Sequence, residues 1–185
     1  MSGYCRVAPG HEFHGPYHAG HYGFPIADDD LLFERLVLEI NQAGLSWLTI
    51  LKKQDSFRAA YSNFEIAKVA RYGDKQRARL LNDAGIIRNR LKVDASIENA
   101  KRIQALQRSH GSFASWLAEH HPLAKPDWVK LFKREFVFTG GEIVGEFLMS
   151  IGYLPGAHAE DCPVYRKIAR QKPAWIQAAA KGMKY

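Results

Sequence analysis

The chain has 185 residues, of which 46% are hydrophobic, and it carries a formal net charge of +7. This length suits one domain with a sizeable core, and the apolar content excludes a disordered chain. The N-terminus lacks a signal-peptide pattern, no apolar run reaches membrane-spanning length, and two cysteines do not make a secreted disulfide framework. We therefore expect a cytoplasmic protein without a membrane partner. Its basic charge favours an anionic partner, with nucleic acid as the leading candidate.

Helical patterns follow one another along almost the whole chain. The acidic residues Asp28, Asp29 and Asp30 suit a helix N-terminus, and the apolar run that follows ends near Gly44, a residue type that commonly terminates helices. Ser46 is placed to cap the next helix. The further expected elements are helices over 56–61, 65–71, 74–82, 88–108, 112–120, 127–136 and 141–151, a loop over 121–126, and a candidate short strand over 136–138.

This pattern predicts an all-α fold in which residues 1–185 form a single domain, with a basic extension at 163–185. The extension carries many Lys and Arg residues with few acidic ones, and Pro173 interrupts it. Two interpretations stay open for the extension: a basic helical tail that touches phosphates, or a solvated terminus that frays.

Two pairs of candidate metal ligands lie at opposite ends of the sequence. Cys5 and His18 are near the start, and His158 and Cys162 form an H-x-x-x-C pair near the end. A structural zinc takes four such ligands in a tetrahedron, and residues four apart on a helix share one face. A disulfide, two unrelated thiols and solvent-exposed histidines are the other interpretations. Under the zinc hypothesis, the metal clips the two ends of the chain together.

The segment 82–90 reads Asn-Asp-Ala-Gly-Ile-Ile-Arg-Asn-Arg and lies between two helical patterns. Gly85 allows a tight turn. We expect the following helix to begin at Ile86–Arg88, so that its free N–H groups and the positive end of its dipole face an anion. This arrangement is typical of a hairpin that grips one DNA phosphate without reading sequence. An ordinary turn between two helices has the same pattern.

A carboxylate interrupts the apolar stripe of the helix that precedes Gly44. Glu39 follows Leu36 on one helical track, where a charged group needs a partner or shifts its pKa. It either accepts hydrogen bonds from buried donors or forms the wall of a pocket for a polar or cationic base. Trp47 then offers a flat surface for stacking, and Gly44 with Leu45 forms a small apolar wedge able to enter a base stack.

With these residues the chain resembles the DNA-3-methyladenine glycosylase I family, within the helix-hairpin-helix superfamily. The resemblance extends over nearly the whole chain, from Cys5 to Cys162. Its longest part is Leu38-Glu39 followed by Gln42-Ala43-Gly44-Leu45-Ser46-Trp47. The other matching residues are Cys5, Tyr17-His18, Gly23, Pro25, Leu51-Lys52-Lys53, Asp83-Ala84-Gly85-Ile86-Ile87-Arg88, His158 and Cys162.

The resemblance implies a monomeric glycosylase of the helix-hairpin-helix fold. A structural zinc on Cys5, His18, His158 and Cys162 would join the N- and C-terminal segments. The activity implied is hydrolysis of the N-glycosidic bond of alkylated purines, chiefly 3-methyladenine, in double-stranded DNA. The damaged base would be flipped out of the duplex into a pocket.

The same resemblance assigns roles to individual side chains. Glu39 would carry catalysis by holding the cationic base, Tyr17 would hydrogen-bond the base, and Trp47 would stack on it. Arg6 and Tyr22 stand at base-pocket positions where the family usually has tryptophan. The residues implied in DNA contact are Gly44 and Leu45 at the wedge, and Gly85, Ile86 and Arg88 at the hairpin.

The chain departs from the family's usual residues at Arg6, His14 and Tyr22, and in the segment that contains Glu142 and Glu146. We expect Glu142 and Glu146 to lie in solvent. These departures leave two alternatives to a 3-methyladenine glycosylase. One is a variant glycosylase that acts on another lesion, and the other is a non-catalytic protein that binds damaged DNA.

Overall fold

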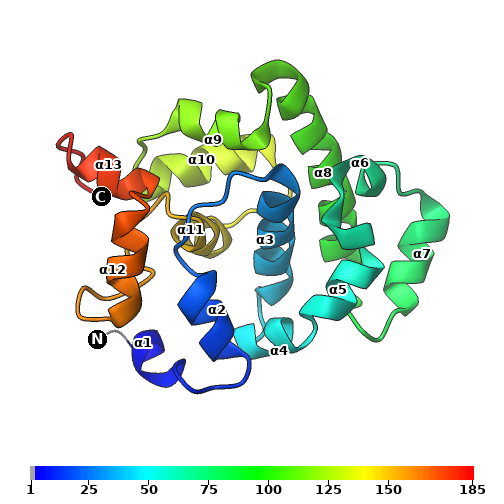
Figure 1. Ribbon diagram of the computed structural model, residues 1–185. Helices are drawn as coiled ribbons and strands as arrows, with labels where there is room; N and C mark the ends of the chain where they lie inside the picture. The colour runs from blue at the N-terminus through cyan, green and yellow to red at the C-terminus, as the bar shows by residue number, and fades with distance from the viewer. Residues whose placement is uncertain (1–2) are drawn as a thin grey trace.

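The computed structural model describes residues 3–185, and every regular element within them is helical (Figure 1), which confirms the all-α prediction. The elements are α1 (Gly3–Val7), α2 (His14–Gly20), α3 (Asp29–Gln42), α4 (Trp47–Lys52), α5 (Gln54–Ala60), the 3₁₀ turn η1 (Ser62–Phe64), α6 (Ile66–Val69), α7 (Asp74–Asn82), α8 (Arg90–His110), α9 (Phe113–His120), α10 (Lys125–Glu135), α11 (Gly141–Ser150), α12 (Pro163–Arg170) and α13 (Ala174–Ala179).

The acidic residues at the start of α3 accept hydrogen bonds from backbone amides of three helices: α3 itself, α6 and α9. Asp28 caps α3 itself by accepting a hydrogen bond from the amide of Leu31. The carboxylate of Asp29 accepts a 2.8 Å hydrogen bond from the amide of Phe113, at the start of α9. Asp30 accepts one of 2.9 Å from the first amide of α6. The position of α3 relative to α6 and α9 is therefore set by hydrogen bonds as well as by packing.

Helix α3 lies at the centre of the molecule, between two groups of helices (Figure 1). Helices α5 to α8 lie on one side, and α1, α2, α12 and α13 on the other. Leu32, Leu36 and Ile40 of α3 are fully buried in the main core. Helix α11 packs against both α3 and α10, which places it opposite the C-terminal half of α3.

The terminal segments form a second, smaller apolar cluster. It joins Cys5 of α1 to Cys162, Val164 and Ile168 at the start of α12. Helix α13 is tied back to the body because the amide of Trp175 donates a 3.2 Å hydrogen bond to the carbonyl of Gly152. Helices α12 and α13 therefore cover much of the basic extension, and Val164, Ile168 and Ala178 are its buried anchors among mostly exposed residues.

Several predicted boundaries are wrong in detail. The helix after the hairpin begins at Arg90 rather than within 86–88, because Asn89 provides its N-cap by accepting from the amide of Lys92 at 3.1 Å. Residues 136–138 form bends and not a strand, since Phe138 has a φ of +62°. Helices α1 and α2 were not predicted, because they are short and carry no clear apolar stripe.

No helix among residues 3–185 combines the length and apolar character needed to cross a membrane.

Candidate functional site

A tight turn joins the end of α3 to the start of α4. Gly44 has a φ of +78°, which L side chains rarely adopt. The side chain of Gln42 donates to the carbonyl of Leu45 at 3.0 Å, and the Leu45 amide donates to the carbonyl of Gln42 at 2.7 Å. Ser46 caps α4, as predicted, by accepting from the amide of Thr49. The closed turn leaves Leu45 with 39% of its surface exposed.

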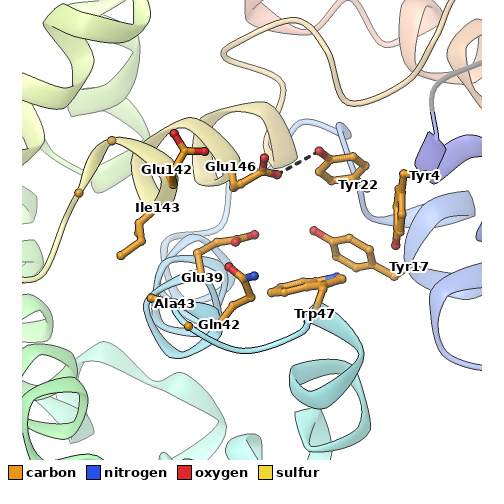
Figure 2. Close-up of a pocket in the computed structure, with 13 residues that line it drawn as sticks. Tyr4, Tyr17, Tyr22, Glu39, Gln42, Ala43, Trp47, Glu142, Ile143 and Glu146 are labelled. Carbon is orange, nitrogen blue, oxygen red and sulfur yellow. Dashed lines mark hydrogen bonds between the residues drawn. The ribbon is translucent and has the colours of Figure 1, made fainter.

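A cavity of about 740 Å³ opens beside this turn. The predicted residues Glu39, Tyr17, Tyr22 and Trp47 all line it, and Figure 2 shows how they and Glu146 surround a common space. Five separate segments contribute: α1, α2 with the loop after it, α3 with the turn after it, α4, and α11 with the residue before it. The remaining lining residues are Tyr4, Gln42, Ala43, Gly44, Gly140, Gly141, Glu142, Ile143 and Glu146.

Glu39 is a buried carboxylate without a partner. It is only 4% exposed, and none of the described residues 3–185 gives it a hydrogen bond or an ion pair. Burial raises the pKa of Glu39 to about 8; the positive charge of Arg35 opposes this shift and the charge of Glu146 adds to it. A buried polar group is normally satisfied, so the exception marks a place where a ligand supplies the missing partner.

Aromatic side chains form one wall of the cavity. The rings of Tyr17 and Trp47 lie with their centroids 5.1 Å apart at an interplanar angle of 57°. The indole N–H of Trp47 is buried and has no hydrogen-bond acceptor within the described part of the chain. A flat base placed over this wall can stack on the indole while its polar edge faces Glu39.

The tyrosines of the pocket are held neutral. The hydroxyl of Tyr17 accepts a hydrogen bond from Arg35 at 3.2 Å and so keeps its own proton for donation. Burial raises the pKa of Tyr17 and Tyr22 well above their usual range, and raises the pKa of Tyr4 to about 12. These phenols therefore act as neutral hydrogen-bonding groups near neutral pH.

Glu146 does not lie in solvent as expected. It is half-buried on α11, lines the cavity, and accepts a 3.2 Å hydrogen bond from the hydroxyl of Tyr22 (Figure 2). Glu142 also lines the cavity, but its side chain is 93% exposed and lies 3.5 Å from Lys125. The expectation is therefore wrong for Glu146, because one helical turn separates the exposed rim from the inner wall.

Arg6 is not among the residues that line the cavity, and its side chain is exposed on α1. Tyr4, two residues earlier, occupies the pocket instead, and its hydroxyl lies 3.2 Å from Nδ1 of His14. Sequence reasoning missed Tyr4, Gln42 and Glu146. Only one local feature pointed to any of them: the aromatic ring of Tyr4 next to Cys5. The N-terminal helices are too short to show a clear apolar periodicity.

The hairpin between α7 and α8 lies beside the turn that carries Leu45. The amide of Gly85 donates to the side chain of Asp83 at 2.7 Å, and a Cβ at Gly85 would lie only 3.0 Å from side-chain atoms of Asp83 and Ser56, so a larger residue here would have to displace them. Ile86 is buried beneath the turn, whereas Arg88 is exposed. Lys53 donates to the carbonyl of Ala84 at 2.9 Å and so connects the hairpin to the end of α4.

The four predicted ligands converge on one buried point. The side-chain donor atoms of Cys5, His18, His158 and Cys162 all lie within 4.8 Å of one another. The Sγ–N distances are 3.7 Å from Cys5 to His158, 3.5 Å from Cys162 to His158, and 3.7 Å from Cys162 to His18. Zn–S and Zn–N bonds in a tetrahedron give an S–N separation of about 3.6 Å. The donor set therefore fits zinc.

Comparison with known proteins agrees with this geometry. The structure of 3-methyladenine DNA glycosylase I from Staphylococcus aureus, solved to explain 3-methyladenine recognition, has a TM-score of 0.78 and 29% identity and covers 88% of this chain and 96% of that one. The fold is thus that of the all-helical 3-methyladenine DNA glycosylases of type I.

Proteins similar in sequence identify the family to which the chain belongs. DNA-3-methyladenine glycosylase of Haemophilus influenzae is 34% identical over 80% of this chain and 89% of its own length, and DNA-3-methyladenine glycosylase 1 of Escherichia coli is also 34% identical with the same coverage. A family model described as methyladenine glycosylase matches residues 8–128. The chain belongs to the methyladenine glycosylase family.

Proposed function

We propose that the protein is a base-excision repair glycosylase that hydrolyses the N-glycosidic bond of alkylated purines, chiefly 3-methyladenine, in double-stranded DNA. The observation that carries this proposal is the buried, unpartnered carboxylate of Glu39 beside the ring of Trp47. A purine alkylated at N3 is positively charged. It gives Glu39 a counter-charge inside the cavity, where none of the described lining residues is a cation.

Each pocket side chain then has a role in excision. Trp47 stacks on the flipped base, Glu39 pairs with its charge, and the Tyr17 hydroxyl donates to a base nitrogen. An alkylated cationic base is already a good leaving group, so holding it in a water-poor pocket supports bond cleavage without strong acid catalysis. Leu45 is placed to fill the gap that the flipped base leaves in the duplex.

The DNA partner is proposed from the surface next to the pocket. Leu45 is exposed on the turn between α3 and α4, and Arg88 is exposed on the hairpin between α7 and α8, so a candidate wedge and a candidate phosphate contact stand on neighbouring turns. The net charge of +7 also supports contact with DNA. We propose that the protein binds duplex DNA as a monomer, in the cytoplasm at the nucleoid.

The test is excision from methylated duplex DNA under single-turnover conditions. Release of 3-methyladenine is expected, and chromatography of the released bases identifies the product. An unmethylated duplex of the same sequence is the control for background depurination. Release of a different alkylated base would point to the variant glycosylase, and binding to methylated duplex without release would point to the non-catalytic alternative.

We also propose that Cys5, His18, His158 and Cys162 hold one structural zinc ion. The Nε2 atom of His158 lies 2.8 Å from the carbonyl of Tyr22, which fixes this nitrogen as the protonated one and leaves Nδ1 for a metal. Bound zinc would join α1 and α2 to the start of α12 and supply stability, not chemistry. Elemental analysis should give about one zinc per chain, and Cys162→Ser should lower both the zinc content and the melting temperature.

A further inference from the structure

Glu146 faces Glu39 across the cavity from a different helix. Glu39 projects from α3 and Glu146 from α11, and their carboxylates point into the same space (Figure 2). The hydroxyl of Tyr22 donates to Glu146 Oε2 at 3.2 Å, which holds this carboxylate at the inner wall. The pocket therefore contains two inward-facing acids, only one of which the function proposed above uses.

Among residues 3–185, those that line the cavity include Glu39, Glu142 and Glu146 but no Lys, Arg or His, although the chain as a whole carries a net charge of +7. The cations Arg35 and Lys125 lie outside the lining. The guanidinium of Arg35 donates hydrogen bonds to the hydroxyl of Tyr17 and to the carbonyl of Ser150. The Nζ atom of Lys125 lies 3.5 Å from Oε1 of Glu142, at the rim of the cavity.

We propose that Glu146 is a specificity-determining residue that makes the pocket select bases carrying a positive charge. This inference rests on the function proposed above and deepens it. Two carboxylates in one confined, partly desolvated space repel one another, and a cation placed between them relieves the repulsion. A neutral base of the same shape leaves them unpaired. Glu146 thus adds a charge requirement to the shape and stacking requirements set by Trp47.

The same charge distinguishes substrate from product. Cleavage of the N-glycosidic bond leaves its electron pair on the base, so the base becomes neutral and the positive charge passes to the sugar. Water then adds to the sugar carbon and releases a proton. Once the base is neutral, Glu39 and Glu146 again lack a counter-charge. The second carboxylate therefore weakens binding of the released base and favours its departure.

The experiment compares two small bases of nearly the same shape and different charge. Binding of the permanently cationic 3,9-dimethyladeninium and of neutral 9-methyladenine is measured by quenching of Trp47 fluorescence, at about pH 8.5, slightly above the pKa of Glu39. Glu146→Gln is expected to weaken binding of the cation by about 10- to 100-fold and to change binding of the neutral base by less than about threefold. Equal changes for both bases, or no change for either, would overturn the inference.

A matched control comes from the same helix. Glu142→Gln removes the same charge one turn away, at an exposed side chain, so its effect on the cation should be several-fold smaller. Excision of 3-methyladenine by the unmodified protein is measured in parallel. If the protein neither excises nor binds either base, the proposed function fails and this inference with it. If excision occurs but Glu146→Gln leaves the charge preference intact, only the inference fails.

Discussion

Two buried ionisable side chains lie near the C-terminal end of α3, and only one of them has hydrogen-bond partners among residues 3–185. Lys92 of α8 is 5% exposed, and its ammonium donates to the carbonyls of Asn41 and Ala43 at 2.8 and 2.6 Å. Glu39 is 4% exposed and has no such partner within residues 3–185. Lys92 satisfies the free carbonyls at the end of the helix, whereas Glu39 faces a cavity.

The difference separates a structural charge from a functional one. Burial lowers the pKa of Lys92, but its hydrogen bonds to two backbone carbonyls offset part of this cost and connect the turn that carries Leu45 to α8. The ionised form of Glu39 has no such partner in the described part of the chain, so burial disfavours it and raises its pKa until a cationic ligand supplies the opposite charge. Substitution of each residue should therefore affect different properties.

The largest effect is expected for Glu39→Gln. Loss of the carboxylate removes the counter-charge for a cationic base, and excision of 3-methyladenine under single-turnover conditions should fall by about 100- to 1,000-fold. The protein should bind undamaged duplex as before, because Glu39 lies inside the pocket and not on the DNA-facing surface. Excision at the original rate would contradict a functional role for the carboxylate of Glu39.

Lys92→Met should give the next largest effect, on stability. The apolar stem is kept, but the carbonyls of Asn41 and Ala43 lose their donor, which should lower the free energy of unfolding by about 2 kcal/mol. Denaturant unfolding measures this change. The control is Arg90→Met, which removes an exposed cation from the start of the same helix and should change stability by less than about 0.5 kcal/mol. Equal losses in both variants would mean that burial of Lys92 has no special role.

The sequence predicted the role of Glu39 but not that of Lys92, and the reason is physical. Glu39, Gly44 and Trp47 lie within one helix and the turn after it, so helical spacing and glycine chemistry were enough to place them together. The roles of Lys92 and Glu146 depend on contacts with residues that lie 51 and 124 positions away in the sequence. No local pattern reports such contacts.

The same limit explains the remaining errors at the site. A base-pocket position at Arg6 was inferred by resemblance, but the short helix α1 turns Tyr4 inward instead. The convergence of Cys5 and Cys162 was predictable because their ligand types and spacings are unusual in a chain with only two cysteines. The sequence can thus predict that distant residues come together where few residue types can do the chemistry, as at a metal site. It cannot do so at a position that many residue types would fit.

An effect of similar size is expected in the pH dependence of stability. Burial raises the pKa of Glu39 from 4.5 to about 8, so the stability contributed by its protonated form is lost progressively as pH rises from 4.5 to about 8. Glu39→Gln should therefore gain stability over the unmodified protein by about 2 kcal/mol between pH 6 and pH 9. Thermal unfolding across this range measures the difference. Glu142→Gln, whose carboxyl is exposed, should show no such trend.

The smallest effect is expected for Leu45→Ala, because it changes neither buried charge. Leu45 is 39% exposed at the tip of the turn, so its truncation should leave the melting temperature within about 2 °C of the original. Excision should still fall by about 10-fold, since the wedge no longer compensates for the unstacked base. A substrate with an unpaired alkylated base requires less unstacking and should recover part of the rate. If Leu45→Ala lowered the excision rate as much on that substrate, Leu45 would act on the pocket itself. The turn between α3 and α4 would then not be a separate DNA-facing element.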